Sequence, residues 1–225
     1  MKTIRFVITT VAAAGALLAQ VRLDSNKMRD DLFAAMSGDK SALKRMFEAS
    51  EPVLAQNPDH AQALMWHGVA TLGAFFMQAQ SGNVQAAFPT LQKATTEMDR
   101  AVLLAPDDVE VRVLRAVMYT PASRSMPGRM GALLLEKARV DFQHTFDLQR
   151  DYLDKIGTHP LGELLQGLGD ANSRLGKPDE AEKYYRLIQT MLKETEYAKR
   201  AGEWMTTRQP LPEARTRCVG CHTGR

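Results

Sequence analysis

The sequence predicts an all-α protein, built from about four helical hairpins and followed by an extended C-terminal tail. Three observations predict this fold class. Apolar residues recur at the spacing of helical turns, and the alternating β-branched runs that are typical of strands are missing. Glycine-centred turns recur at intervals of 44 to 48 residues, and each interval has room for two helices. We therefore expect eight helices in four helix–turn–helix units.

The chain begins with the pattern of a signal peptide, which we assign to residues 1–19. Lys2 and Arg5 give a basic start, and the apolar run that follows is too short to span a bilayer comfortably. Small residues permit cleavage after Ala16 or Ala19. An uncleaved membrane anchor is the alternative. We expect an exported protein, periplasmic or extracellular, with no stable membrane insertion once the signal is cleaved.

Removal of the signal takes away two positive charges and leaves a formal net charge of about +1. A chain this close to neutral gives no reason to expect a nucleic-acid partner. Roughly 205 residues remain, which is enough for one domain or one short repeat array.

Four turns divide the expected repeat domain, which we place at residues 24–205. They are centred on Gly38, Gly82, Gly128 and Gly176. Two similar four-residue segments separate successive units, one ending in Pro58-Asp59 and the other in Pro106-Asp107. Proline cannot continue a helix and aspartate can cap the next one. Each segment is therefore expected to end one helix and begin another.

The last helix of the array is expected to run from Pro178 to Met205. One face carries an apolar stripe and the opposite face carries charged residues. The stripe consists of Ala181, Tyr185, Ile188, Leu192, Thr195 and Ala198.

This repeat resembles the tetratricopeptide repeat (TPR) family. The last unit has leucine, glycine, alanine and aromatic residues at the family's spacing, with asparagine where an aromatic is usual: Leu165, Leu168, Gly169, Asn172, Gly176, Ala181 and Tyr185. Earlier units contribute Trp66, Ala94, Met98, Ala101, Pro106, Ala138 and Phe142. The resemblance implies a TPR-like solenoid with a concave surface for a partner, and no catalysis by the array itself. The intervals exceed the family's usual period of about 34 residues, so a HEAT-like array is the alternative.

The tail, residues 206–225, begins as an expected extended linker because Pro210 and Pro212 interrupt the helical pattern. It then contains CVGCH, with both cysteines of the chain, Cys218 and Cys221, followed at once by His222. This motif is typical of c-type haem attachment, in which the thiols bind the two vinyl groups and the histidine is the proximal iron ligand. Attachment after export agrees with the signal peptide.

Other uses of the motif are less well supported by the rest of the chain. A zinc site needs a fourth ligand and usually a second cysteine pair. A thioredoxin-like dithiol needs a βαβ unit, and the sequence has no strand pattern. A disulfide between these cysteines would close too small a loop to stabilise the fold much. An exposed tail with a chance match is the remaining alternative.

The distal haem ligand stays open at this stage. The candidates are His67, His159 and His60, and a five-coordinate iron is a further alternative. His60 and His67 are seven residues apart on one expected helix, whose small residues Ala63, Ala70 and Ala74 would leave room for a macrocycle. In the TPR arrangement His67 points into the concave groove. Close helix packing explains the same small residues, and we prefer that interpretation.

Together these features predict an exported monohaem c-type cytochrome, an electron carrier rather than an enzyme, with redox proteins as partners. Like subunits are another expected partner, because a haem near the chain end could dock against a neighbouring copy. The alternative is a periplasmic TPR-type adaptor in which the haem is structural or absent. A cytochrome c′ bundle is disfavoured because such chains are much shorter. A peroxidase-like enzyme would need distal polar residues that the sequence does not identify.

Overall fold

The computed structural model of the chain describes residues 22–80, 84–126 and 128–212. Within these ranges the protein has nine α-helices and one 3-10 helix, and no strand. The all-α prediction is therefore confirmed. The described part contains one α-helix more than the eight that the repeat spacing predicts. No helix in this part of the chain combines the length and the apolar character needed to cross a bilayer.

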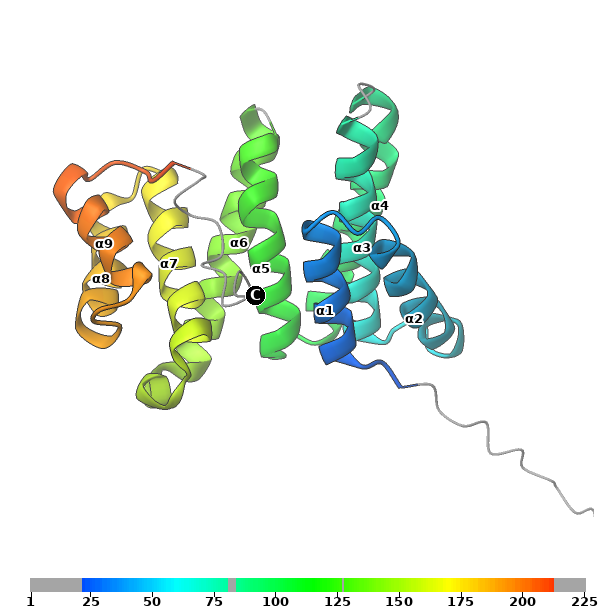
Figure 1. The fold of residues 1–225 in the computed structure, drawn as a ribbon, viewed down its shortest axis with the longest axis horizontal. Helices are drawn as coiled ribbons and strands as arrows, with labels where there is room; N and C mark the ends of the chain where they lie inside the picture. The colour runs from blue at the N-terminus through cyan, green and yellow to red at the C-terminus, as the bar shows by residue number, and fades with distance from the viewer. Residues whose placement is uncertain (1–21, 81–83, 127, 213–225) are drawn as a thin grey trace, which may run out of the picture.

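Eight of the helices form four successive hairpins (Figure 1). Their bounds are α1 (Ser25–Met36) and α2 (Ala42–Gln56), α3 (Ala61–Gln80) and α4 (Val84–Leu104), α5 (Val109–Ser125) and α6 (Gly128–Gln149), and α7 (Thr158–Arg174) and α8 (Pro178–Met191). The 3-10 helix η1 (Arg150–Lys155) lies between the third and fourth hairpins, and α9 (Glu196–Thr207) follows the fourth.

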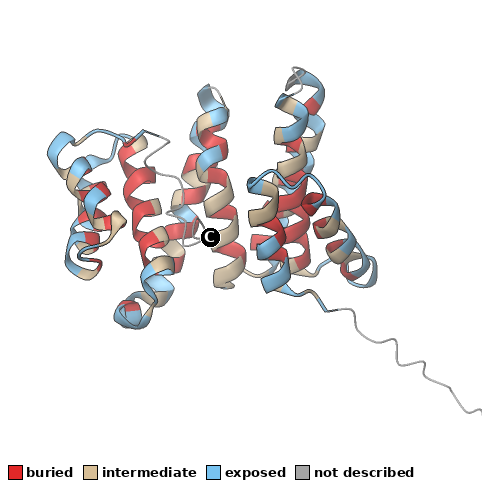
Figure 2. Ribbon diagram, in the orientation of Figure 1, coloured by how far each residue is buried: buried red, intermediate tan, exposed pale blue. Residues whose placement is uncertain are grey.

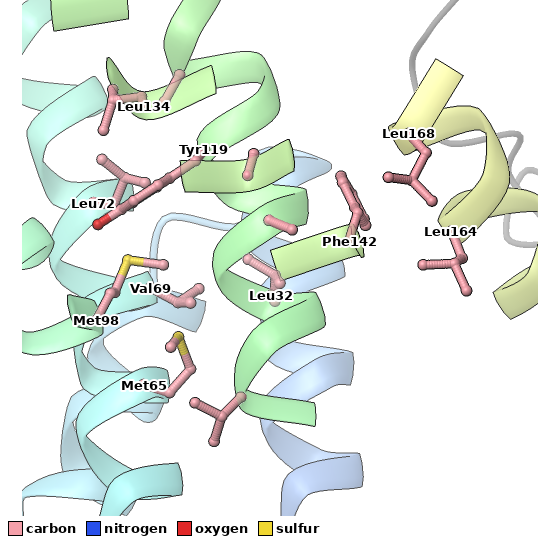
Figure 3. Close-up of a cluster of buried hydrophobic side chains, with 14 of the residues drawn as sticks. Leu32, Met65, Val69, Leu72, Met98, Tyr119, Leu134, Phe142, Leu164 and Leu168 are labelled. Carbon is pink, nitrogen blue, oxygen red and sulfur yellow. The ribbon is translucent and has the colours of Figure 1, made fainter. Parts of the chain in front are cut away.

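The hairpins stack in a row along the long axis of the molecule (Figure 1). The odd-numbered helices contact one another in succession, from α1 to α9. The second helix of each hairpin also contacts the first helix that follows it. One apolar core runs through the whole stack, and Figure 2 shows its buried residues on the helix faces that meet. In Figure 3, Phe142 of α6 faces Leu164 and Leu168 of α7 across such an interface.

Glycine marks three of the four turns as predicted. Gly38 between α1 and α2, and Gly176 between α7 and α8, have φ angles of +101° and +72°. These left-handed conformations carry no steric penalty only for glycine. Gly128 begins α6 with a φ of +57°. The turn predicted at Gly82 lies outside the described residues.

The helix caps between units differ from those that the sequence suggests. The side chain of Asp108, not Asp107, accepts the amide N–H of Val111 at 3.2 Å and caps α5. Before α3, His60 rather than Asp59 supplies the acceptor, because its Nδ1 lies 3.2 Å from the amide nitrogen of Ala63. His60 lies just before Ala61, the first residue of α3, and its ring caps that helix.

The single helix expected from Pro178 to Met205 is wrong, because the chain breaks into α8 and α9 after Met191. Glu194 has a left-handed φ of +62°, and the hydroxyl of Thr195 accepts the amide N–H of Ala198 at 3.2 Å to cap α9. α9 then buries Trp204, whose ring stacks on that of Tyr185 with the centroids 4.7 Å apart. The break thus folds α9 back against α8.

The residues that resemble the repeat family in the last unit lie at the interface of α7 and α8. A Cβ atom added to Gly169 would be 2.7 Å from the ring of Tyr185, so only glycine permits this approach. The neighbouring apolar members of the pattern are fully buried: Leu165, Leu168, Ala181 and Tyr185. The buried Asn172 donates its side-chain N–H to the carbonyl of Leu168 at 2.9 Å, which satisfies a polar group where an aromatic was expected.

Two buried carboxylates join α5 to its neighbours. Asp141 of α6 accepts from Arg112 at 2.8 Å and from Arg115 at 2.6 Å. Asp170 of α7 accepts from Arg124 of α5 at 2.8 Å and from Arg174 at 3.2 Å. Burial raises the pKa of Asp170, and the two guanidinium groups oppose that shift. The contacts of α5 with α6 and with α7 are therefore polar as well as apolar.

Candidate functional site

The predicted haem-attachment residues Cys218, Cys221 and His222 lie outside the described residues. The described part of the chain bears on the candidate site in two ways. It contains the start of the tail, and it contains the three histidines considered as distal ligands. No three His, Cys, Asp or Glu side chains gather into a metal-binding group among the described residues.

The tail begins two residues later than expected, because α9 continues through Thr207. Arg208 then takes a left-handed φ of +56° and ends the helix. Its guanidinium forms ion pairs with Asp179, at 3.0 Å, and with Glu182, and lies over the ring of Trp204, 5.1 Å from the centroid. We call residues 208–212 the tail base. Its first residue is held against α8 and α9.

The tail base returns to the helical array instead of extending away from it. Leu211 is only 4% exposed, although Pro210 and Pro212 on either side are exposed. Its carbonyl accepts from Nη2 of Arg124 at 3.3 Å, and the same nitrogen donates to Asp170. The prediction of an extended linker that separates the tail from the array is therefore wrong up to Pro212. The tail base docks where α5 meets α7.

His67 does not point into an open groove. Its side chain is 5% exposed and lies between α2 and α4. Nδ1 is 2.8 Å from Oε2 of Glu97, and the ring meets that of Phe47 edge-on at 5.0 Å. Ala63 and Ala70 beside it are fully buried. The small residues thus serve close helix packing, and the groove position expected for His67 is wrong.

The tautomer of His60 does not suit a haem ligand. Its Nδ1 accepts the amide N–H of Ala63, so Nδ1 carries the lone pair. In a neutral imidazole the proton is then on Nε2, and a protonated nitrogen cannot bind iron. Ligation by His60 would require the loss of the cap of α3.

His159 is half-buried in the first turn of α7, and a hydrogen-bond chain fixes its ring. Its Nδ1 is 3.1 Å from the hydroxyl oxygen of Tyr197 in α9. Tyr197 donates its own hydroxyl proton to Oε1 of Glu163 at 2.8 Å. The tyrosine oxygen is therefore the acceptor toward His159, which places the imidazole proton on Nδ1 and the lone pair on Nε2.

Sequence reasoning found His159 but missed the two residues that orient it. Glu163 lies four residues after His159, a spacing that brings two side chains together on a helix, and this signal was available. Tyr197 comes from another helix, so its contact depends on the unpredicted break before α9. The ring of Tyr197 also fills the space above Gly162, where an added Cβ would be 2.3 Å from it.

A half-open pocket of mixed polarity begins at Thr158, the residue next to His159. It has a volume of about 360 Å³ and lies where η1, the start of α7 and the end of α8 meet. Its lining is mainly aliphatic and includes one methionine: Leu153, Asp154, Ile156, Thr158, Leu161, Met191 and Leu192.

Comparisons with protein-family models, curated proteins and solved structures found no match for this chain.

Proposed function

We propose that the protein is an exported monohaem c-type cytochrome that transfers electrons through a covalently bound haem. Cys218 and Cys221 are the thioether attachment residues, and His222 is the proximal iron ligand. The observation that carries the proposal is the CVGCH motif, which uses both cysteines of the chain and places a histidine directly after them.

The donor set fits this group. Two thiols at this spacing match the two vinyl groups of a haem, and the adjacent imidazole supplies a nitrogen for the iron. The group supplies one-electron chemistry at its iron, and the protein supplies attachment, orientation and the surrounding polarity. The basic and apolar start of the chain supports export, which is where such attachment takes place.

The helical array is proposed to be a TPR-like scaffold. The four hairpins, the succession of odd-numbered helices and the contact of Gly169 with Tyr185 support this interpretation. In such an array the first helices line a concave face that binds partners. Redox proteins are the proposed partners, and a second copy of the chain is another.

A periplasmic adaptor with a structural haem, or with none, is the second candidate function. The extended row of helices favours it, because repeat arrays commonly present such surfaces to other proteins. An adaptor without haem predicts a colourless, folded protein.

Export of the full chain from a host with the haem-attachment machinery tests the proposal. The purified protein is denatured, and its reduced absorption spectrum is compared with that of Cys218→Ala/Cys221→Ala. We expect haem to stay with the wild-type chain through denaturation and to be absent from the variant. The rate at which the reduced native protein passes its electron to an oxidised redox protein then separates an electron carrier from an adaptor with a structural haem. A colourless, folded wild-type protein would contradict the cytochrome.

A further inference from the structure

We propose that the exposed face of α6 binds a second copy of the chain, with the two α6 helices antiparallel. Four residues on this face carry the inference, and we call them the α6 row: Arg129, Leu133, Val140 and Asp147. The inference rests on the part of the proposed function that names a second copy as a partner. It does not require the haem, so the cytochrome and the α6 contact can fail separately.

The α6 row forms a nearly straight line along the helix. Its members are separated by four, seven and seven residues. At 3.6 residues per turn they lie within about 40° of one another around the helix axis, over a length of about 27 Å. All four are exposed, Leu133 to 51% and Val140 to 44%. The row therefore presents two aliphatic side chains to solvent between a basic residue and an acidic one.

Exposed apolar side chains gather on α6. Ten large apolar side chains are exposed in the described part of the chain, and four of them lie on α6, more than on any other helix. The described residues of α8, the second helix of the next hairpin, include none. A single exposed apolar residue is ordinary, but several on one face commonly mark a contact surface.

The charged side chains beside the α6 row already have partners within the chain. They pair as follows: Lys137 with Asp99, His144 with Asp107, and Glu136 with Arg139 and Lys177. Arg129 and Asp147 form no ion pair with any described residue. The carboxylate of Asp147 accepts from the neutral side chain of Gln143 at 3.1 Å. The two charges at the ends of the row are thus left to pair outside the chain.

Charge complementarity selects an antiparallel second copy as the occupant. Antiparallel packing sets Arg129 against the second copy's Asp147, and the two-fold symmetry of such a dimer repeats this pair at the other end of α6. A parallel copy would set each charge against its own equivalent, which is unfavourable. The row is therefore complementary to itself in one orientation only.

The same register interleaves the apolar side chains. When Arg129 is level with the second copy's Asp147, the second copy's Val140 lies level with residue 136. Its Leu133 then lies level with residue 143. Apolar side chains from the two copies alternate at levels 133, 136, 140 and 143 of α6. Spacings of three and four residues are those at which paired helices interlock. Because each copy contributes one helix, the contact is small and the dimer is expected to be weak and reversible.

Sedimentation of the exported full chain over a wide range of protein concentration tests the inference. We expect the wild type to pass from monomer to dimer as its concentration rises. Leu133→Glu places a charge among the apolar side chains of the contact and should raise the dissociation constant about tenfold or more. Met36→Glu is the matched control, because Met36 is an exposed apolar residue at the end of α1, and it should leave the dimer unchanged.

Exchange of the two charges tests the antiparallel register. Arg129→Asp and Asp147→Arg each set like charges together at both ends of α6 and should raise the dissociation constant several-fold. The double variant Arg129→Asp/Asp147→Arg restores opposite charges and should return the dissociation constant to near the wild-type value. Circular dichroism of each variant checks that the helices are intact.

Each other outcome overturns the inference. A wild type that stays monomeric at every concentration shows that no second copy covers the α6 row and leaves this face to another occupant. A dimer that Leu133→Glu does not weaken uses a different surface. Weakening by both single charge variants without recovery in the double variant contradicts the antiparallel register. A chain that dimerises as expected but carries no haem contradicts the proposed cytochrome and leaves the α6 contact standing.

Discussion

The two halves of the array are held together differently. In α1 to α4 the packing is dominated by apolar side chains, among them the fully buried methionines Met28, Met46, Met65 and Met98, and one buried carboxylate, Asp31, pairs with Arg45. In α5 to α9, buried carboxylates pair with arginines, and the tail base docks on one of these pairs. Each half has a histidine with its Nδ1 hydrogen-bonded, yet His67 is enclosed and His159 is not. The comparison shows that a hydrogen bond at Nδ1 orients an enclosed imidazole in one half and a half-exposed imidazole in the other.

The largest effect is expected from Asp141→Ala in α6, within the half of the array that α5 to α9 form. The change leaves Arg112 and Arg115 buried without their shared carboxylate, which should lower the free energy of unfolding by about 3–5 kcal/mol. Urea unfolding followed by circular dichroism measures it. Asp179→Ala is the control, because that side chain is 92% exposed and should change stability little. Equal effects from the two variants would contradict the buried network.

The next effect is expected at the tail base. Leu211→Ala removes a buried side chain and should lower the free energy of unfolding by about 2–4 kcal/mol. Leu103→Ala provides the control, since Leu103 is 80% exposed and lies in α4, far along the chain from the tail base. If Leu211→Ala and Leu103→Ala both have the urea midpoint of the wild type, the tail base is not docked on the array.

The third prediction concerns His67, the enclosed histidine in the half that α1 to α4 form. His67→Leu leaves the carboxylate of Glu97 without its imidazole partner and should cost about 1–3 kcal/mol of stability. Because His67 serves packing, the haem spectrum of the exported protein should stay unchanged. A changed haem spectrum in His67→Leu would contradict a purely structural role for His67.

The smallest effect is expected at the exposed turn between α1 and α2. The hydroxyl of Ser41 and the guanidinium of Arg45 lower the pKa of Asp39 from 3.8 to about 2. A carboxyl whose pKa is lowered by folding stabilises the fold above its unfolded pKa, and this contribution is lost as the pH falls from about 4 to 2. The melting temperatures of wild type and Asp39→Asn should therefore differ at pH 6 and converge near pH 2. A constant difference across that range would contradict the shift.

Much of the helical architecture could be predicted from the sequence because its signals are local. Gly38 and Gly176 occupy turns that need a left-handed backbone, so glycine itself reveals them. The stripe from Ala181 to Leu192 follows the helical period, and those residues are buried. The haem motif is a local signal too, and it stays a prediction because it lies outside the described residues.

The features that sequence reasoning missed depend on contacts between distant segments. The apolar stripe continues past Leu192 with the same period, so neither glycine nor proline reveals the break; Thr195 followed by Glu196 was the available cap signal. Leu211 looks like part of a proline-rich linker until Arg124, far away in the sequence, is seen to bind its carbonyl. The groove position of His67 failed because α2 covers that face of α3.

The intact mass of the exported protein tests the central claim most directly. The account predicts a mature chain that begins after Ala16 or Ala19 and carries the added mass of one haem. The same chain with Cys218→Ala/Cys221→Ala should have the mass of the polypeptide alone. A wild-type mass equal to that of the bare mature polypeptide, from a host that attaches haem to a control cytochrome, would contradict the account.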